Sequence, residues 1–223
     1  MTPRIALIHA TALAAEPIRA AFGRHWPQAR CMNLLDDSLS VDRAEAGSLT
    51  PAMVQRFVDL AAYAQRTGCT GILFTCSAFG PAIEAAAGAT GLPTLKPNEA
   101  MFEDALALKA TGTLRLGLIA TFEASIPSMS DELQALARQR GQTVDLRSVF
   151  VAGAMQDLAD GRADAHHQKV AVAASALADC DAVMLAQFSM AAAAPAVQAE
   201  VPGRVLSSPD CAVLALRKRM SHG

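Results

Sequence analysis

Cys76 is the residue of this 223-residue chain best placed to do chemistry, because it stands where a predicted strand turns into a helix. The apolar run 71–75 precedes it, and the small residues Ser77 and Ala78 follow it. A thiol at the start of a helix has a lowered pKa, so the position predicts a thiolate able to transfer a proton. Most cysteines are small buried hydrophobic residues instead. That second interpretation fits the other four: Cys31, Cys69, Cys180 and Cys211.

The elements that position Cys76 follow from short apolar runs that alternate with helical periodicity. Eight runs are predicted as strands: 4–9, 30–35, 71–75, 92–95, 114–120, 143–150, 182–186 and 204–206. Five segments with apolar spacing near 3.6 are predicted as helices: 51–66, 98–110, 128–140, 163–178 and 210–220. Strands that alternate with helices indicate βαβ units and mostly parallel sheets. The predicted fold class is therefore α/β.

A repeat at one fixed offset divides the predicted strands into two sets. Three pairs of segments match at an offset of 111 residues: 5–8 with 116–119, 69–74 with 180–185, and 92–95 with 203–206. Any two α/β domains look alike at this level, but a single offset shared by three strand pairs favours duplication. We therefore predict two pseudo-symmetric, Rossmann-like lobes.

Duplication also predicts where a small molecule binds. In an open parallel sheet, ligands bind beyond the carboxyl ends of the strands, where backbone N–H groups of the following helices are free. Two lobes related by a pseudo-twofold axis turn these edges toward one active-site cleft, with Cys76 and Gln187 at matching positions. Hydroxyl and N–H groups there form a natural cradle for a carboxylate or enolate. The predicted substrate-binding residues follow the strands: His9, Thr11, Ser77, Ala78, Thr121, Phe122, Phe188, Ser189 and Ser208.

Four stretches resemble the aspartate/glutamate/hydantoin racemase superfamily: 71–78, 116–121, 181–190 and 205–209. The resemblance covers nearly the whole chain, and it implies an enzyme without cofactor or metal in which two cysteines, one per lobe, move a proton at the substrate α-carbon. Arylmalonate decarboxylase and maleate isomerase share the scaffold, and the decarboxylase uses a single cysteine. The resemblance also implies that the C-terminal helix packs on the first lobe. The implied lobes are residues 1–97 plus 208–223, and residues 98–207.

Gln187 departs from the racemase pattern, because it stands where the second cysteine is expected. A carboxamide has no useful proton affinity near neutral pH and acts only as a hydrogen-bonding group. His9 ends the first strand and is either an acid–base group or a polar residue that orients the loop or hydrogen-bonds a substrate carboxylate. Residues 36–49 are predicted as an exposed loop that can act as a lid, and His166 is predicted to be solvated.

Three functions stay open on this pattern. The first is a cofactor-independent racemase or isomerase that acts at the α-carbon of a small carboxylate, amino acid or hydantoin-like compound. The second is a cofactor-free decarboxylase in which Cys76 delivers one proton to one face. The third is a non-catalytic protein that binds a small carboxylate.

Composition narrows the partners and the compartment. A formal net charge of −2 gives no electrostatic basis for binding nucleic acid or an anionic membrane. Five cysteines without a C-x-x-C pair are neither a disulfide framework nor a zinc site, which favours a reducing cytoplasm. The glycine-rich phosphate-binding motifs are missing, so we predict no nucleotide cofactor and no metal. A small-molecule carboxylate is the predicted partner, and a homo-oligomer stays open.

Overall fold

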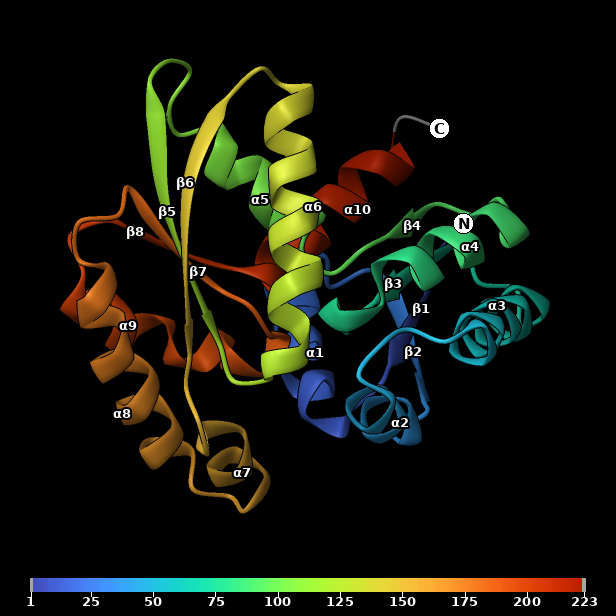
Figure 1. Ribbon diagram of the computed structural model, residues 1–223. Helices are drawn as coiled ribbons and strands as arrows, with labels where there is room; N and C mark the ends of the chain where they lie inside the picture. The colour runs from blue at the N-terminus through green and yellow to red at the C-terminus, as the bar shows by residue number, and fades with distance from the viewer. Residues whose placement is uncertain (1, 222–223) are drawn as a thin grey trace. The chain divides into compact units, whose positions relative to one another are not determined.

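The computed structural model describes residues 2–221 and divides into two compact units. The first unit runs to Pro97 and resumes at Pro209, and the second unit is Asn98–Ser208. Each unit contains a four-stranded sheet whose strand pairings are all parallel, flanked by helices (Figure 1). The predicted α/β class with two parallel sheets is confirmed.

The sheet of the first unit has the strand order β2-β1-β3-β4. Its strands are β1 (Arg4–His9), β2 (Arg30–Leu35), β3 (Gly71–Phe74) and β4 (Thr94–Leu95). Its helices are α1 (Ala15–His25), α2 (Ser38–Ala46), α3 (Pro51–Arg66), α4 (Gly80–Thr90) and the C-terminal α10 (Ser208–Ser221), with 3-10 turns η1 (Ala12–Ala14) and η2 (Ser77–Phe79). Asp210 of α10 contacts Arg24 at 2.7 Å and His25 at 2.8 Å, which ties the end of the chain to α1.

Helix α3 shows how the local sequence defines an element. The Thr50 side chain accepts the N–H of Met53 at 3.3 Å, and Pro51 occupies the first turn, where its missing N–H costs nothing. The buried residues of α3 recur every three or four positions: Met53, Phe57, Ala61 and Ala64. One face of the helix therefore packs on the core, as its apolar spacing predicts.

The sheet of the second unit has the equivalent strand order β6-β5-β7-β8. Its strands are β5 (Thr113–Ala120), β6 (Thr143–Phe150), β7 (Ala182–Leu185) and β8 (Arg204–Ser207). Its helices are α5 (Glu99–Leu106), α6 (Ile126–Gln139), α7 (Ala154–Ala159), α8 (Ala163–Ala174) and α9 (Ala194–Glu200), with 3-10 turns η3 (Glu123–Ser125), η4 (Ser175–Leu177) and η5 (Phe188–Ala193). Within the described residues, none of the helices has the length and apolarity that crossing a membrane requires.

Strand register repeats between the units at the offset found in the sequence. Ile5 pairs with Gly71 in the first sheet, and Leu116 pairs with Ala182 in the second, so both partners are shifted by 111 residues. The β3–β4 and β7–β8 pairings repeat in the same way. Residues at one offset therefore occupy equivalent positions in the two sheets, including the residues that follow β3 and β7.

The sequence pattern predicts a loop over residues 36–49, but most of them form helix α2. Its apolar signal is weak because Leu39 is its one buried residue among those described. The helix is stabilised by contacts from elsewhere in the first unit, described with the site below. The prediction of a loop is therefore wrong for this segment, whereas its lid role stays a prediction.

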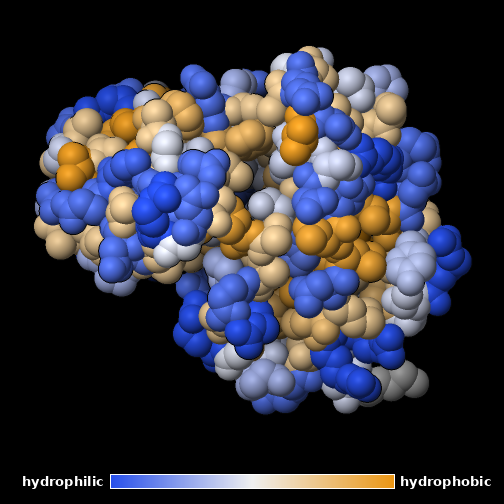
Figure 2. Space-filling view, turned by 90° about the horizontal axis from the view of Figure 1, so that it is seen from below, coloured by the Kyte–Doolittle hydropathy of each residue, from blue (hydrophilic) through white to orange (hydrophobic). Residues whose placement is uncertain are grey.

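Exposed apolar side chains are spread over several elements. Figure 2 shows hydrophobic groups among hydrophilic ones on one face of the surface. The large exposed apolar residues are Leu35, Val41, Tyr63, Leu108, Phe150, Val172 and Leu214. Scattered apolar residues of this kind are normal on protein surfaces and do not by themselves indicate a binding site.

His166 on α8 is buried, which corrects the prediction that it is solvated. Its exposed fraction is 0%, and neither ring nitrogen has a hydrogen-bond partner within residues 2–221. Burial and the neighbouring His167 lower the pKa of His166, and the charge of Asp157 opposes them only in part. Val170 lies one turn along α8 and is also buried, so His166 belongs to the apolar face of that helix.

We expect the free energy of unfolding to fall as the pH drops below about 6.5, the ordinary pKa of histidine. In that range the unfolded chain binds a proton that neutral His166 does not, and the loss is complete below its lowered folded pKa. His166→Leu should flatten this acid limb strongly, and His167→Leu should flatten it less, because burial lowers the pKa of His166 more than the charge of His167 does. A residual slope is expected because burial also lowers the pKa of His9. Urea unfolding across this pH range measures the effect, and equal acid limbs in His166→Leu and the unmodified chain would contradict it.

Gly203, just before β8, has no room for a side chain. A Cβ atom there would clash with the carbonyl oxygen of Cys180 and lie 3.0 Å from that of Asp181. Because both are backbone atoms, Gly203→Ala should lower the free energy of unfolding by about 1–3 kcal/mol. Gly88→Ala in α4 is the control, because nothing lies within 4 Å of its Cβ position. Alanine at position 88 should stabilise that helix by about 0.5–1 kcal/mol. If the urea unfolding midpoints of Gly203→Ala and Gly88→Ala shift in the same direction, the predicted difference between the two positions is wrong.

Candidate active site

Cys76 lies at the carboxyl end of the first sheet, between β3 and the 3-10 turn η2. Its side chain is half-buried. Three groups act on the thiol: the backbone N–H of Ala78, the hydroxyl of Ser40 and the positive charge of Arg43. The site in the first unit is therefore assembled from the end of β3, the turn η2 and helix α2.

Burial dominates the ionisation of Cys76. It raises the pKa of the thiol to about 11, although the three surrounding groups all act to lower it. The prediction of a thiol pKa lowered by a helix dipole is therefore wrong. Turn η2 is short and α4 begins only at Gly80, so the thiol is not at the first turn of an α-helix. At neutral pH Cys76 is protonated, which suits a proton donor.

Helix α2 brings two polar side chains to Cys76. Ser40 and Arg43 are three residues apart, so they share one face of α2. The Ser40 hydroxyl donates a hydrogen bond to the carbonyl oxygen of Ala10, just after β1, at 2.6 Å. Nε and Nη1 of Arg43 are buried without a hydrogen-bond partner in the described part of the chain. Buried donors are costly unless paired, and the planar arginine fork matches a carboxylate, so Arg43 is suited to bind an anionic group beside the thiol.

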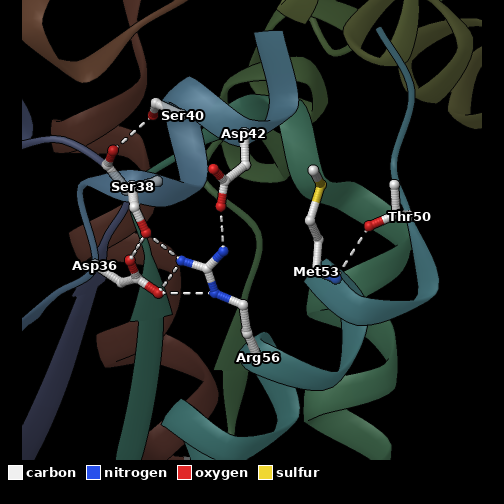
Figure 3. A network of polar contacts seen from close by, with 8 residues as sticks. Asp36, Ser38, Ser40, Asp42, Thr50, Met53 and Arg56 are labelled. Carbon is white, nitrogen blue, oxygen red and sulfur yellow. Dashed lines mark hydrogen bonds and ion pairs between the residues drawn. The ribbon is translucent and has the colours of Figure 1, made fainter. Parts of the chain in front are cut away.

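A second arginine holds α2 in place (Figure 3). Arg56 of α3 forms ion pairs with Asp36 and Asp42 and donates a hydrogen bond to Ser38. Its Nε lies 3.0 Å from Oδ2 of Asp36. These contacts join α2 and the segment just before it to α3. Because Asp42 is paired with Arg56, this carboxylate is not the partner of the adjacent Arg43.

His9 is buried, and both of its ring nitrogens are hydrogen-bonded. Nε2 lies 2.9 Å from Oδ1 of Asn33, and Nδ1 lies 2.8 Å from the hydroxyl of Thr75, the residue before Cys76. The amide oxygen of Asn33 can only accept, so Nε2 carries the proton and Nδ1 accepts from Thr75. Burial lowers the pKa of His9, although the Asn33 contact raises it. The arrangement fits the orienting role predicted for His9 better than the acid–base role.

Gln187 occupies the position in the second unit that matches Cys76, two residues after the end of β7 and just before η5. Its Oε1 accepts two hydrogen bonds from Thr121, one from the backbone N–H at 2.7 Å and one from the hydroxyl at 3.2 Å. Its Nε2 donates to the Ser125 hydroxyl at 2.8 Å, and that hydroxyl donates to the carbonyl of Phe122 at 2.7 Å. Both ends of the carboxamide are therefore hydrogen-bonded inside the second unit, and the group offers no site that can take up a proton near neutral pH.

Comparison with known families decides the relationship of the chain. The model of the Asp/Glu/Hydantoin racemase family matches residues 7–216. The chain belongs to this racemase family. A comparison with curated proteins gives no significant match.

Solved structures similar to this racemase-family chain include racemases and a decarboxylase. Glutamate racemase RacE1 from Bacillus anthracis has a TM-score of 0.75 and 17% identity, over 99% of this chain and 82% of that one. Allantoin racemase from Klebsiella pneumoniae has a TM-score of 0.67 and 17% identity, over 99% and 89%. A glycine-to-cysteine variant of arylmalonate decarboxylase with an associated sulfate ion has a TM-score of 0.64 and 22% identity, over 99% and 94%. At these identities the likeness shows a shared fold.

In the first unit of this racemase-family chain, the predicted site residues have distinct surroundings. Ala78 directs its backbone N–H at Cys76, and the adjacent Ser77 is buried. Thr11 lies at the start of η1, where its side chain accepts the N–H of Leu13 at 3.4 Å. Cys76 and Ala78 are therefore brought together, whereas Thr11 serves the turn that follows β1.

In the second unit, Thr121 and Gln187 are bonded to each other, but two other predicted residues belong to the core. Phe188 is 1% exposed and Ser208 is 0% exposed. The Ser208 hydroxyl donates to Oδ1 of Asn98 at 2.8 Å, so it is already engaged. Ser189 is also buried, and Phe122 is half-buried. These surroundings favour packing roles for Phe188 and Ser208.

Sequence reasoning missed several residues that shape the two sites: Asn33, Ser40, Arg43, Thr75 and Ser125. The signal for Ser40 and Arg43 is their spacing of three, which has meaning only on a helix. Because residues 36–49 are predicted as a loop, the spacing of Ser40 and Arg43 does not indicate that they share one face. Ser125 follows Phe122 in a 3-10 turn, and no local pattern links it to Gln187.

Proposed function

We propose that this racemase-family chain is a cofactor-independent enzyme that transfers a proton at the α-carbon of a small carboxylate or amino-acid-like substrate. The observation that carries the proposal is the pairing of the Cys76 thiol with the unpartnered, buried guanidinium nitrogens of Arg43 in the described part of the chain. One group moves the proton, and the other binds the carboxylate attached to the reacting carbon.

Arg43 contributes to binding and to the reaction. A carboxylate held by its planar fork places the attached α-carbon near the thiol, because the two carbons are directly bonded. When the α-carbon gains an electron pair, negative charge spreads into that carboxylate as an enediolate. The fixed positive charge of Arg43 stabilises this intermediate more than the substrate, which is how a preorganised charge lowers a barrier.

Racemisation is the reaction that family membership favours. It requires one group to remove the α-proton and another to return a proton to the opposite face. Cys76 can fill one of these roles, but Gln187 can fill neither, because a carboxamide does not exchange protons near neutral pH. An isomerase mechanism therefore needs water or another acid–base group opposite Cys76.

Decarboxylation is a second candidate, favoured by the protonated state of a single thiol. A carboxylate leaves as CO₂, and its bonding electron pair stays on the α-carbon as an enediolate. The S–H group of Cys76 then gives its proton to that carbon, and water returns a proton to the thiolate. This route needs one acid on one face, and a thiol whose pKa is raised to about 11 meets that need.

Incubation in deuterated buffer tests the proposal and separates the two reactions. α-Amino carboxylates and α-substituted malonates serve as probes, followed by NMR. Racemisation replaces the α-proton by deuterium and yields both enantiomers, whereas decarboxylation releases CO₂ and incorporates one deuteron. A chain that binds these probes without either change is a binding protein, and this result would overturn the proposal.

A further inference from the structure

Thr121 directs two donors at one point in the second unit. Its backbone N–H and its hydroxyl both reach Oε1 of Gln187, at 2.7 Å and 3.2 Å. Thr121 is 5% exposed, so these donors have little access to water. Two donors that converge on one carbonyl oxygen in a dry environment form the arrangement of an oxyanion hole.

The orientation of the Gln187 amide is fixed by its other end. Nε2 donates to the hydroxyl oxygen of Ser125, which is fully buried. The hydrogen of that hydroxyl is directed to the carbonyl of Phe122, so Ser125 can only accept from the amide. A flipped amide would place its NH₂ group against the two Thr121 donors. The position at Thr121 therefore selects an oxygen acceptor.

We propose that Thr121 forms a carboxylate-binding oxyanion hole in the second unit and that the side-chain oxygen of Gln187 occupies this hole. The neutral amide oxygen takes the place where a carboxylate oxygen would bind, so carboxylates are excluded while Gln187 stays bound. Gln187 is then a specificity-determining residue and not an acid or base. One consequence of this proposal is that Arg43 alone binds the substrate carboxylate, and that consequence rests on the proposed function. The oxyanion hole at Thr121 does not depend on the proposed function.

Gln187→Glu tests whether the position stabilises negative charge. The new carboxylate would accept the same two Thr121 hydrogen bonds, so its pKa should fall below the ordinary value of about 4.3. Gln198→Glu is the matched control, because Gln198 is held mainly through its nitrogen. Nε2 of Gln198 donates to the carbonyl oxygens of Val201 and Gly203, at 3.1 Å and 2.9 Å. A carboxylate facing these carbonyls should have a raised pKa.

Gln187→Ala tests the vacated hole with acetate as the probe. Acetate should shift the Thr121 amide NMR signal saturably in Gln187→Ala, with an affinity at least about tenfold higher than in the unmodified chain. Adding Thr121→Val removes one donor and should weaken that binding. Both experiments measure groups of the second unit and do not require catalytic turnover. A negative result in them can therefore be told apart from a failure of the proposed reaction at Cys76. The proposal is overturned if the carboxylate introduced by Gln187→Glu has a pKa at or above its ordinary value, or if Gln187→Ala shows no saturable acetate shift.

Discussion

Cys76→Ala is expected to lower kcat by about 10²–10⁴-fold, the range that general acid–base catalysis contributes. Alanine keeps the backbone conformation after β3 but has no proton to give. Cys69→Ala is the matched control, because Cys69 is a buried cysteine of the first unit that precedes β3, at the other end of the strand. Steady-state kinetics with circular dichroism on both variants makes the measurement. Equal kcat values in the two variants would contradict the role of Cys76.

The raised thiol pKa gives the same residue a pH signature. Alkylation by iodoacetamide requires the thiolate, so Cys76 should react slowly at neutral pH and faster as the pH rises toward about 11. A thiol pKa lowered by a helix start, as the sequence predicts, would instead give rapid labelling at neutral pH. Bound substrate should slow labelling further, because its carboxylate offsets the charge of Arg43. Rapid labelling at a pH of about 7, followed by mass spectrometry of the Cys76 peptide, would show that burial does not control this thiol.

Arg43→Met is expected to lower kcat/KM by about 10- to 100-fold, the equivalent of one charge-assisted hydrogen bond to the substrate. The same change should raise the free energy of unfolding by about 1 kcal/mol, because it removes buried donors that have no partner among the described residues. Activity and stability therefore move in opposite directions. A residue that only supports the fold would lower both.

Arg56→Met provides that contrast on the neighbouring helix. Arg56 pairs with Asp36 and Asp42, so its loss should lower stability and, by releasing α2, lower activity as well. Urea unfolding and kcat/KM on the two arginine variants measure both quantities. If Arg43→Met loses stability as Arg56→Met does, Arg43 supports the fold and does not receive the substrate carboxylate.

The sequence alone determined the two parallel sheets and the positions that follow their strands. Apolar runs such as 5–8 and 71–74 are local patterns, and the shared offset of 111 residues reappears unchanged in the strand register. Once the strands are known, Cys76 and Gln187 follow as equivalent residues after β3 and β7. Backbone periodicity and burial carry this information, and both can be read from neighbouring residues.

Only the tertiary structure decided the chemistry of those positions. The pKa of Cys76 depends on how completely the fold removes water from the thiol and on Arg43, which comes from a helix that local spacing did not predict. The roles of His9 and Gln187 depend on Asn33 and Thr121, which are distant in sequence but adjacent in the fold. Desolvation and hydrogen bonding act over a few ångströms of space, so local sequence patterns do not record them.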